Sequence, residues 1–272
     1  MSFINLYDSH THSDNSPDGR QSVTYMCEHG VALGLRGIAI TDHCEVDNYE
    51  GGRYHISIRQ SNFECLKAKS VFRGSLIVSS GIELGQPLSN IAISEKLLCD
   101  YDFDFVLASV HNASNGADYY YIDYSEYSAS DVRLLLQDYF EDVLAVARWN
   151  RFDSLAHLTY PLRYLHAKGI SVELSEYADV IDEILKTLAD NQKALEINTS
   201  GYRQGLGTPL PPFSCVKRFK ELGGEYITIG SDGHRSSDVG MNIQDGMQLA
   251  LEAGFEQFAL YLSRTPMLID LK

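Results

Sequence analysis

The sequence lacks the marks of a disulfide-stabilised, membrane-spanning or nucleic-acid-binding protein. Its five cysteines are scattered without a Cys-x-x-Cys pair, which argues against a cysteine zinc finger and favours a reducing, cytoplasmic compartment. No apolar run approaches the length of a membrane span, and no apolar signal-peptide core follows a basic start. We therefore expect no membrane partner. The formal net charge of −15 repels phosphate backbones, so we expect no nucleic-acid partner either.

Short apolar segments alternate with amphipathic ones along the 272 residues, which are long enough for one large core. This alternation predicts strands over residues 3–7, 37–40, 76–82, 103–110, 154–156, 194–197 and 226–230. It predicts helices over residues 22–33, 62–72, 94–99, 131–149, 177–190, 211–222 and 243–253, with Ser22 and Ser130 as N-caps. Residues 44–59 and 112–129 are predicted loops, and a short apolar run at 258–260 closes the chain.

The fold class follows from this order of elements. Strands that alternate with helices indicate a parallel sheet with helices outside. No Gly-x-Gly-x-x-Gly follows any predicted strand, so a closed or nearly closed α/β barrel is favoured over a dinucleotide-binding sheet. We expect residues 1–272 to form a single domain.

A His-x-His pair follows the first predicted strand. Side chains two residues apart in an extended segment point to the same side, so His10 and His12 can face one ion. Asp18 follows after a Ser-Pro turn that can bring its carboxylate back towards them. Imidazole and carboxylate suit zinc, iron or manganese. Taken alone, the pair is a weak signal, because two solvated histidines at a strand end explain it as well.

Similar polar residues recur where the other predicted strands end. Because these ends meet at one mouth of a parallel barrel, the side chains should converge there, and a multi-metal centre explains so many acids and bases in a confined space. The converging residues are His10, His12, Asp18, His43, Glu83, His111, His157, Asp232 and His234. Some of these residues also have other interpretations when taken singly: Glu83 as a carboxylate at a helix start, and His157 as a buried histidine bonded to backbone. Two further residues stay open: Cys44, beside His43, is either a ligand or a packed residue, and His55 is a loop residue with or without a substrate contact.

The motifs resemble those of a known family. The segments that carry the resemblance are His10-Thr11-His12, Thr41-Asp42-His43, Gly81-Ile82-Glu83, Ser109-Val110-His111, Ala156-His157-Leu158 and Ser231-Asp232-Gly233-His234. In this order they resemble the polymerase and histidinol phosphatase (PHP) family. Residues 103–111, 193–199 and 222–232 look like the monofunctional histidinol-phosphate phosphatases within it.

The resemblance implies a distorted (β/α)7 TIM-like barrel that holds three divalent metal ions, which would be zinc, manganese or iron. The first metal would be held by His10, His12, Glu83 and Asp232. Glu83 would bridge to the second, which His111 and His157 complete, and Asp18, His43 and His234 would hold the third. Many members of the family have a histidine where Asp18 stands.

The resemblance also implies an activity, the hydrolysis of a small phosphorylated metabolite, with L-histidinol phosphate as the expected substrate. A hydroxide that bridges two metals would attack phosphorus, and Arg163 and Arg203 would bind the phosphoryl oxygens, although surface ion pairing also explains arginines in such loops. Asp42 is expected to act as a partner of the ligands or as a proton shuttle. The loop 47–53 and Tyr119, Tyr120 and Tyr121 are candidates for the substrate wall.

Two other functions stay open at this point. One is a phosphodiesterase or nucleotide phosphohydrolase of the same family, a function that predicts a basic groove or a nucleotide-binding insertion. The other is a non-catalytic metal-binding regulatory module, which would lack some ligands.

Overall fold

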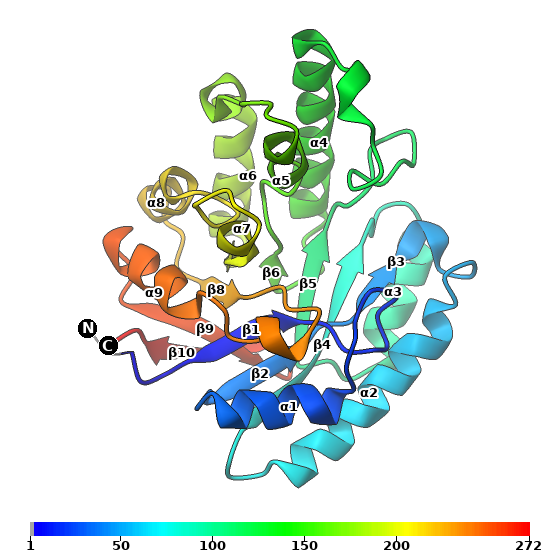
Figure 1. The fold of residues 1–272 in the computed structure, drawn as a ribbon, viewed down its shortest axis with the longest axis vertical. Helices are drawn as coiled ribbons and strands as arrows, with labels where there is room; N and C mark the ends of the chain where they lie inside the picture. The colour runs from blue at the N-terminus through cyan, green and yellow to red at the C-terminus, as the bar shows by residue number, and fades with distance from the viewer. Residues whose placement is uncertain (1–2) are drawn as a thin grey trace.

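The computed structural model describes residues 3–272. Its parallel strands curve into a nearly closed barrel, and helices cover the outside (Figure 1). The sheet runs in the order β1-β2-β4-β5-β6-β7-β8, and the short β3 pairs with β4. A parallel bridge between Thr11 and Gly233 joins the ends of β1 and β8. The strands are β1 Tyr7–Thr11, β2 Gly37–Ile40, β3 His43–Glu45, β4 Ile77–Gly85, β5 Phe105–Ser109, β6 Ser154–Leu155, β7 Ala194–Asn198 and β8 Ile227–Gly230. The predicted distorted (β/α)7 TIM-like barrel is therefore confirmed.

The helices cover the outer face because each carries one apolar side. In α6, Ile181, Ile184, Leu185 and Leu188 recur at helical spacing and are all buried. The helices are α1 Val23–Ala32, α2 Tyr54–Val71, α3 Ile91–Asp100, α4 Ala129–Trp149, α5 Leu162–Ala167, α6 Ala178–Asp190, α7 Ser200–Arg203, α8 Phe213–Glu221 and α9 Ile243–Glu252. Single 3-10 turns lie at η1 Val46–Asn48, η2 Tyr124–Glu126, η3 Leu174–Tyr177 and η4 Ser236–Asp238. Among residues 3–272, no helix has the length and apolar character that crossing a membrane requires.

A C-terminal hairpin closes the amino-terminal end of the barrel. It consists of β9 (Gln257–Leu262) and β10 (Thr265–Asp270), which pair antiparallel. Its turn is held by Asp104, which accepts from the Ser263 amide, and by Asp153, which accepts from Arg264 Nε at 2.5 Å. Asp104 and Asp153 directly precede β5 and β6, so the hairpin leaves the carboxyl ends of the strands open for a site.

Several predicted boundaries were wrong. The first strand covers residues 7–11 and not 3–7, so His10 lies inside it. The predicted apolar run ended at Tyr7, but the strand continues through Asp8, whose buried carboxylate accepts from the Ser231 amide and hydroxyl and from the Gly240 amide. Burial of a polar side chain is tolerated when hydrogen bonds replace its water.

Two further expectations fail locally. Residues 44–59 are not a loop, because they contain most of β3, η1 and the first turns of α2. Ser128 caps α4 in place of Ser130, since the Ser128 hydroxyl accepts from the Asp131 amide and the Asp131 carboxylate accepts from the Ser128 amide. The strand β10, which is mostly exposed, follows the short run at 258–260 and was not foreseen.

Candidate metal centre

The carboxyl ends of the strands bring together all the residues that the sequence predicts as metal ligands. His10 lies near the end of β1 and His12 follows the strand, His43 begins β3, and Glu83 lies near the end of β4. The remaining residues, His111, His157, Asp232 and His234, follow β5, β6 and β8, and Asp18 lies in the loop after β1. Most of these side chains are buried, while 59% of the Asp18 side chain is exposed.

The first predicted ligand group gathers around two imidazole nitrogens. His10 Nε2 and His12 Nε2 are 3.0 Å apart. Glu83 Oε2 lies 3.4 Å from the former and 3.5 Å from the latter. Asp232 Oδ1 lies 3.8 and 3.5 Å from the same two nitrogens. These four side chains, from β1, β4 and the end of β8, therefore surround one small space.

The second group shares Glu83 with the first. Glu83 Oε1 is 2.8 Å from His157 Nε2 and 3.1 Å from His111 Nε2. The two imidazole nitrogens lie 3.4 Å apart. Glu83 thus directs one carboxylate oxygen to each group, as a bridging ligand would.

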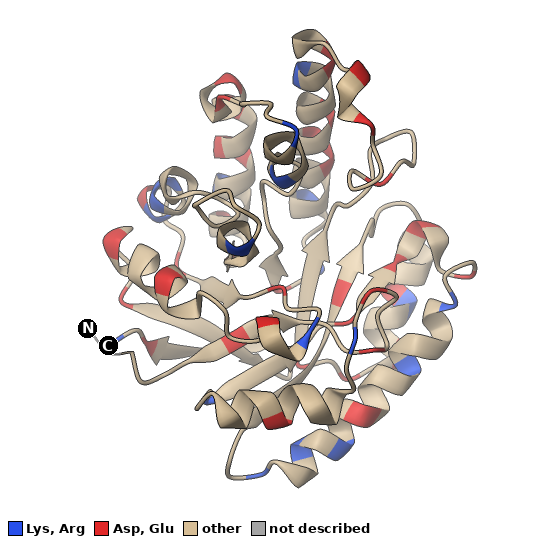
Figure 2. Ribbon diagram, in the orientation of Figure 1, with Lys and Arg blue, Asp and Glu red and all other residues tan. Residues whose placement is uncertain are grey.

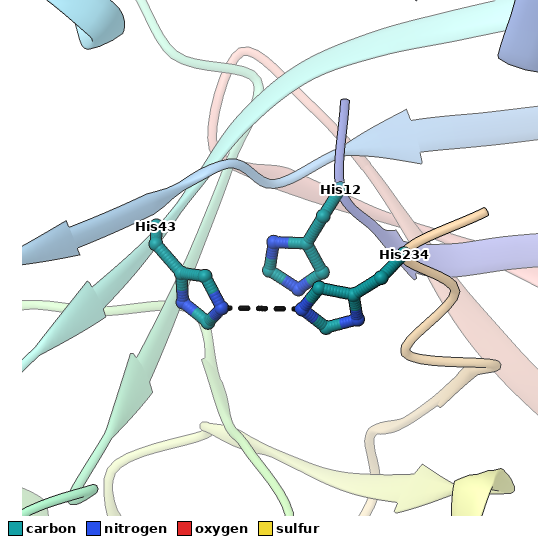
Figure 3. Close-up of side chains that lie close together, drawn as sticks. All are labelled: His12, His43 and His234. Atoms are coloured by element: carbon teal, nitrogen blue, oxygen red, sulfur yellow. Dashed lines mark hydrogen bonds between the residues drawn. The ribbon is translucent and has the colours of Figure 1, made fainter. Parts of the chain in front are cut away.

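The third group lies nearer the surface. Figure 3 shows His43, His234 and His12, whose rings lie side by side, and the 3.3 Å contact between the Nε2 atoms of His43 and His234. Asp18 places its Oδ2 3.1 Å from His234 Nε2 and its Oδ1 3.7 Å from His43 Nε2. His43 also points its other nitrogen, Nδ1, at Glu83 Oε2, so its ring stands between the third group and the other two.

Hydrogen bonds on the far side of four rings leave Nε2 facing the cluster. His10 Nδ1 contacts Glu196, His111 Nδ1 contacts Glu45, and His234 Nδ1 contacts the Asp232 carbonyl, at 2.6, 2.8 and 3.0 Å. His12 Nδ1 lies 3.3 Å from the Ser16 hydroxyl. Ring nitrogens held in this way are typical of metal-ligating histidines, because the outer bond fixes the tautomer and the ring orientation.

The unsatisfied atoms of the cluster fit a cation. His43 Nδ1 and Glu83 Oε2 lie 2.9 Å apart, yet both are buried and neither has a hydrogen-bond partner within the described residues. Buried polar atoms without a partner are rare in folded proteins. A cation bound by Glu83 Oε2 would satisfy that oxygen, and the mixed imidazole and carboxylate set suits zinc, iron or manganese.

The electrostatics of the cluster favour ionised carboxylates. Burial opposes charge on Glu83, but His111, His10 and His43 hold the pKa of this carboxyl well below its usual value. Burial also lowers the pKa of His12, and His234 and His43 add to this effect. For His43, burial is outweighed by Glu83 and Asp18, which raise its pKa to about 9. Without a metal ion, protons on rings such as that of His43 therefore balance the charge of the buried carboxylates. A bound metal ion would displace these protons.

The backbone is strained at two of the predicted ligands. His157 and Asp232 have φ angles of 22° and 55°, in a region that residues other than glycine rarely adopt. Such strain persists only where surrounding contacts enforce it, and it concentrates at functional sites. Both residues lie two positions after the last residue of a strand, β6 and β8, and their side chains contact Glu83 and His10, respectively.

Two predicted catalytic residues, Arg163 and Arg203, both contact Asp232, one through its side chain and the other through its backbone. Arg163 is buried in α5 with its guanidinium 3.3 Å from Asp232 Oδ2 and stacked over Tyr160. Arg203 donates to the backbone carbonyls of Ser231 and Asp232, both at 3.0 Å.

Asp42 and the remaining candidates lie outside the cluster of rings. The Asp42 carboxylate accepts from the hydroxyls of Ser13, Ser16 and Ser61 and from the Ser13 amide. Cys44 is buried in the core, and His55 is exposed in α2, where it lies near Glu50.

Sequence reasoning missed Glu45 and Glu196, whose carboxylates hold ligand histidines. A signal for each is visible in hindsight. Glu196 is a charged residue between the apolar Leu195 and Ile197 of a strand, and Glu45 lies two residues after His43, on the same side of β3. Neither signal alone separates such a role from an ordinary polar position.

Comparison with known proteins agrees with this geometry. Residues 8–200 match the PHP domain. The chain belongs to the PHP family. Among PHP relatives, the probable histidinol-phosphatase of Clostridium acetobutylicum is 31% identical over 249 residues, which cover 90% of this chain and 92% of the relative. The probable histidinol-phosphatase of Thermotoga maritima is 31% identical over 255 residues, covering 94% and 95%.

A solved structure shares the fold of almost the whole chain. It is that of histidinol phosphate phosphatase from Lactococcus lactis, complexed with zinc, L-histidinol and phosphate. It superposes with a TM-score of 0.81 over 97% of this chain and 99% of its own, at 24% sequence identity.

We expect the H12N substitution to remove bound metal, because His12 lies between the first and third groups. After loading with zinc or manganese, purified H12N should contain at least one ion per chain fewer than wild type, as counted by mass spectrometry. The control is H29N, which changes a histidine of α1 outside the cluster and should keep the wild-type metal content. Equal metal content in both variants would contradict the assignment of His12.

Proposed function

We propose that this PHP protein is a metal-dependent phosphomonoesterase that hydrolyses L-histidinol phosphate to L-histidinol and phosphate. The observation that carries the proposal is the complete set of imidazole and carboxylate donors beside the buried, cationic Arg163. The names of relatives that match nine-tenths or more of this chain support the same substrate.

The proposed site holds three divalent cations in the ligand groups described above, with Glu83 shared by the first two. Cations bound there would lower the pKa of water towards neutrality and offset the charge that develops on the phosphoryl oxygens. Zinc, manganese and iron all suit these donors. The protein contributes the fixed, largely buried geometry of the ligands.

Arg163 is the proposed phosphate-binding cation. Burial opposes its charge, but Tyr164 and Asp232 raise the pKa of its guanidinium, so it stays protonated. Its Nε is buried and has no hydrogen-bond partner among the described residues, and its side chain is fixed by Asp232 and the Tyr160 ring. A buried, unsatisfied donor beside the metal cluster is suited to a phosphoryl oxygen.

Asp42 and Arg203 are better suited to positioning than to direct contact. The four hydrogen bonds to the Asp42 carboxylate organise the loop after β1. Its partner Ser16 also contacts His12 Nδ1 and accepts from the His43 amide. This favours the role of a partner of the ligands over that of a proton shuttle. Arg203 similarly fixes the carbonyls at the end of β8, next to the Asp232 carboxylate.

The alcohol part of the substrate would occupy a cavity of about 910 Å³ that opens from the cluster. His43, His111 and Asp18 line one part of it, and its walls carry Tyr160 and Tyr164. Acidic side chains complete the lining at Glu45, Asp47 and Asp118. Histidinol carries an amine and an imidazole, which such an acidic and aromatic wall suits.

Two features refine the expected substrate wall. Tyr120 and Tyr121 line the cavity, whereas Tyr119 is fully buried in the core, so its predicted place in the wall was wrong. The Lys and Arg positions are scattered over α2, α4, α8 and the loops (Figure 2). This distribution favours a small metabolite over a nucleic-acid strand.

A phosphate-release assay with manganese or zinc tests the proposed reaction. We expect hydrolysis of histidinol phosphate at a kcat/KM well above that of simple monoesters without a cationic group. The diester bis-p-nitrophenyl phosphate should be a poor substrate. Activity on the diester alone would contradict the proposal, and full metal loading without any hydrolysis would favour a regulatory module.

The R163K substitution should lower kcat/KM by about 100-fold, because lysine keeps the charge but loses the two-nitrogen fork and the Nε donor. The matched control is R148K on α4, where the exposed arginine pairs with Glu183 of α6. Metal content should be unchanged in both variants. A kcat/KM for R163K equal to that of R148K would exclude Arg163 from the site.

A further inference from the structure

Glu196 is a buried carboxylate that the proposed reaction does not use. It lies in the middle of β7 with no exposed surface. Its ion-pair contact is with His10, and no Lys or Arg side chain within residues 3–272 pairs with it. Burying a carboxylate costs free energy unless several donors replace its water, so the contacts of Glu196 indicate what holds it there.

Glu196 receives donors from three segments. One oxygen, Oε1, lies 2.6 Å from His10 Nδ1. The other, Oε2, accepts from the His157 amide at 2.7 Å and from the Asn198 side-chain amide at 3.1 Å. The carboxylate therefore uses both oxygens as acceptors, towards β1 on one side and the end of β6 on the other.

The contact with His10 determines which ring nitrogen faces the cluster. When His10 Nδ1–H donates to Glu196, the lone pair is on Nε2, the atom 3.0 Å from His12 Nε2. The contact with the His157 amide fixes a residue whose backbone is strained at φ 22°. His157 in turn directs its Nε2 to Glu83. One carboxylate thus orients a ligand of the first group and a ligand of the second.

Packing leaves Glu196 little freedom to move. A Cβ on Gly230, in the neighbouring strand β8, would lie 2.3 Å from His10 Cβ and 2.8 Å from Glu196 Oε1. Glycine is therefore required there for this close approach. Asn198 continues the contacts towards Asp232, whose Oδ2 lies 3.4 Å from the Asn198 amide nitrogen.

We propose that Glu196 is a positioning residue that couples metal loading of the first and second ligand groups, an inference that rests on the proposed metal centre. Its two acceptor oxygens are both needed, because His10 Nδ1–H and the His157 amide are both donors. Glutamine has the same shape but one acceptor. In E196Q, the amide NH₂ must therefore face one of these donors, which disturbs His10 or the His157 backbone.

The test is metal binding by the full chain in the absence of substrate. Wild type, E196Q and D153N are titrated with zinc or manganese, and ions per chain are counted by mass spectrometry. D153N removes another buried carboxylate that accepts from a strand amide, but at the opposite end of the barrel. Circular dichroism verifies that each variant is folded.

We expect metal affinity in E196Q to fall by about 10–100-fold at two sites, as is usual for loss of a partner of a ligating histidine. One ion, held by Asp18, His43 and His234, should remain, and D153N should load as wild type does. Unchanged loading in E196Q would overturn the inference, as would an equal loss at every site in both variants.

A second variant covers the case in which E196Q does not fold. E196D keeps two acceptors on a stem one methylene shorter, so it cannot reach both donors and should weaken the same two sites. Uniform or absent weakening in E196D would overturn the inference. Wild-type protein that binds no metal would overturn the metal centre as well, whereas metal-loaded wild type that fails to hydrolyse histidinol phosphate would contradict the proposed function alone.

Discussion

The structure depends on the compensation of one buried carboxylate. Glu83 is fully buried and directs Oε1 to His111 and His157 and Oε2 to His10, His12 and His43. An isolated carboxylate in this position would be prohibitively costly. Compensation comes from rings on four other strands or their carboxyl ends, so the site requires the barrel to be assembled before any of its parts has the right neighbours. The proposed cations would satisfy the nitrogen and oxygen atoms that no protein group satisfies.

The barrel provides this assembly by separating its two ends. Parallel strands bring their carboxyl ends to one mouth, where polar side chains form successive layers. The rings face inwards, and carboxylates such as Glu196 and Glu45 hold the far side of the rings. Asp42 accepts from the Ser16 hydroxyl, which in turn contacts His12 Nδ1. At the other end, the β9–β10 hairpin pairs its turn with Asp104 and Asp153, so that polar residues there are structural and leave the chemistry to the opposite end.

The sequence was most informative where a short apolar run ends in a histidine or carboxylate, because the parallel arrangement then determines where that side chain must be. For this reason the seven-stranded order and the convergence of residues such as His43 and Asp232 could be predicted. The sequence was least informative where the role of a polar side chain depends on partners that only the folded structure reveals. The first strand was expected to end before Asp8, because the partners that allow burial of Asp8, Ser231 and Gly240, are more than two hundred residues away. Ser128 and Ser130 are equally good caps in composition, and the geometry of Asp131 decides between them. Glu196 could not be assigned, since an acidic residue in an apolar strand has many explanations until its neighbours are known.

The most direct test of this account is the location of metal ions by anomalous X-ray scattering from crystals of the protein loaded with zinc or manganese. The account predicts separate anomalous peaks within the three ligand groups, with Glu83 bound to two of the ions through different oxygens. Peaks confined to exposed acidic residues on the outer helices, with the imidazole rings around Glu83 bound to no ion, would contradict it.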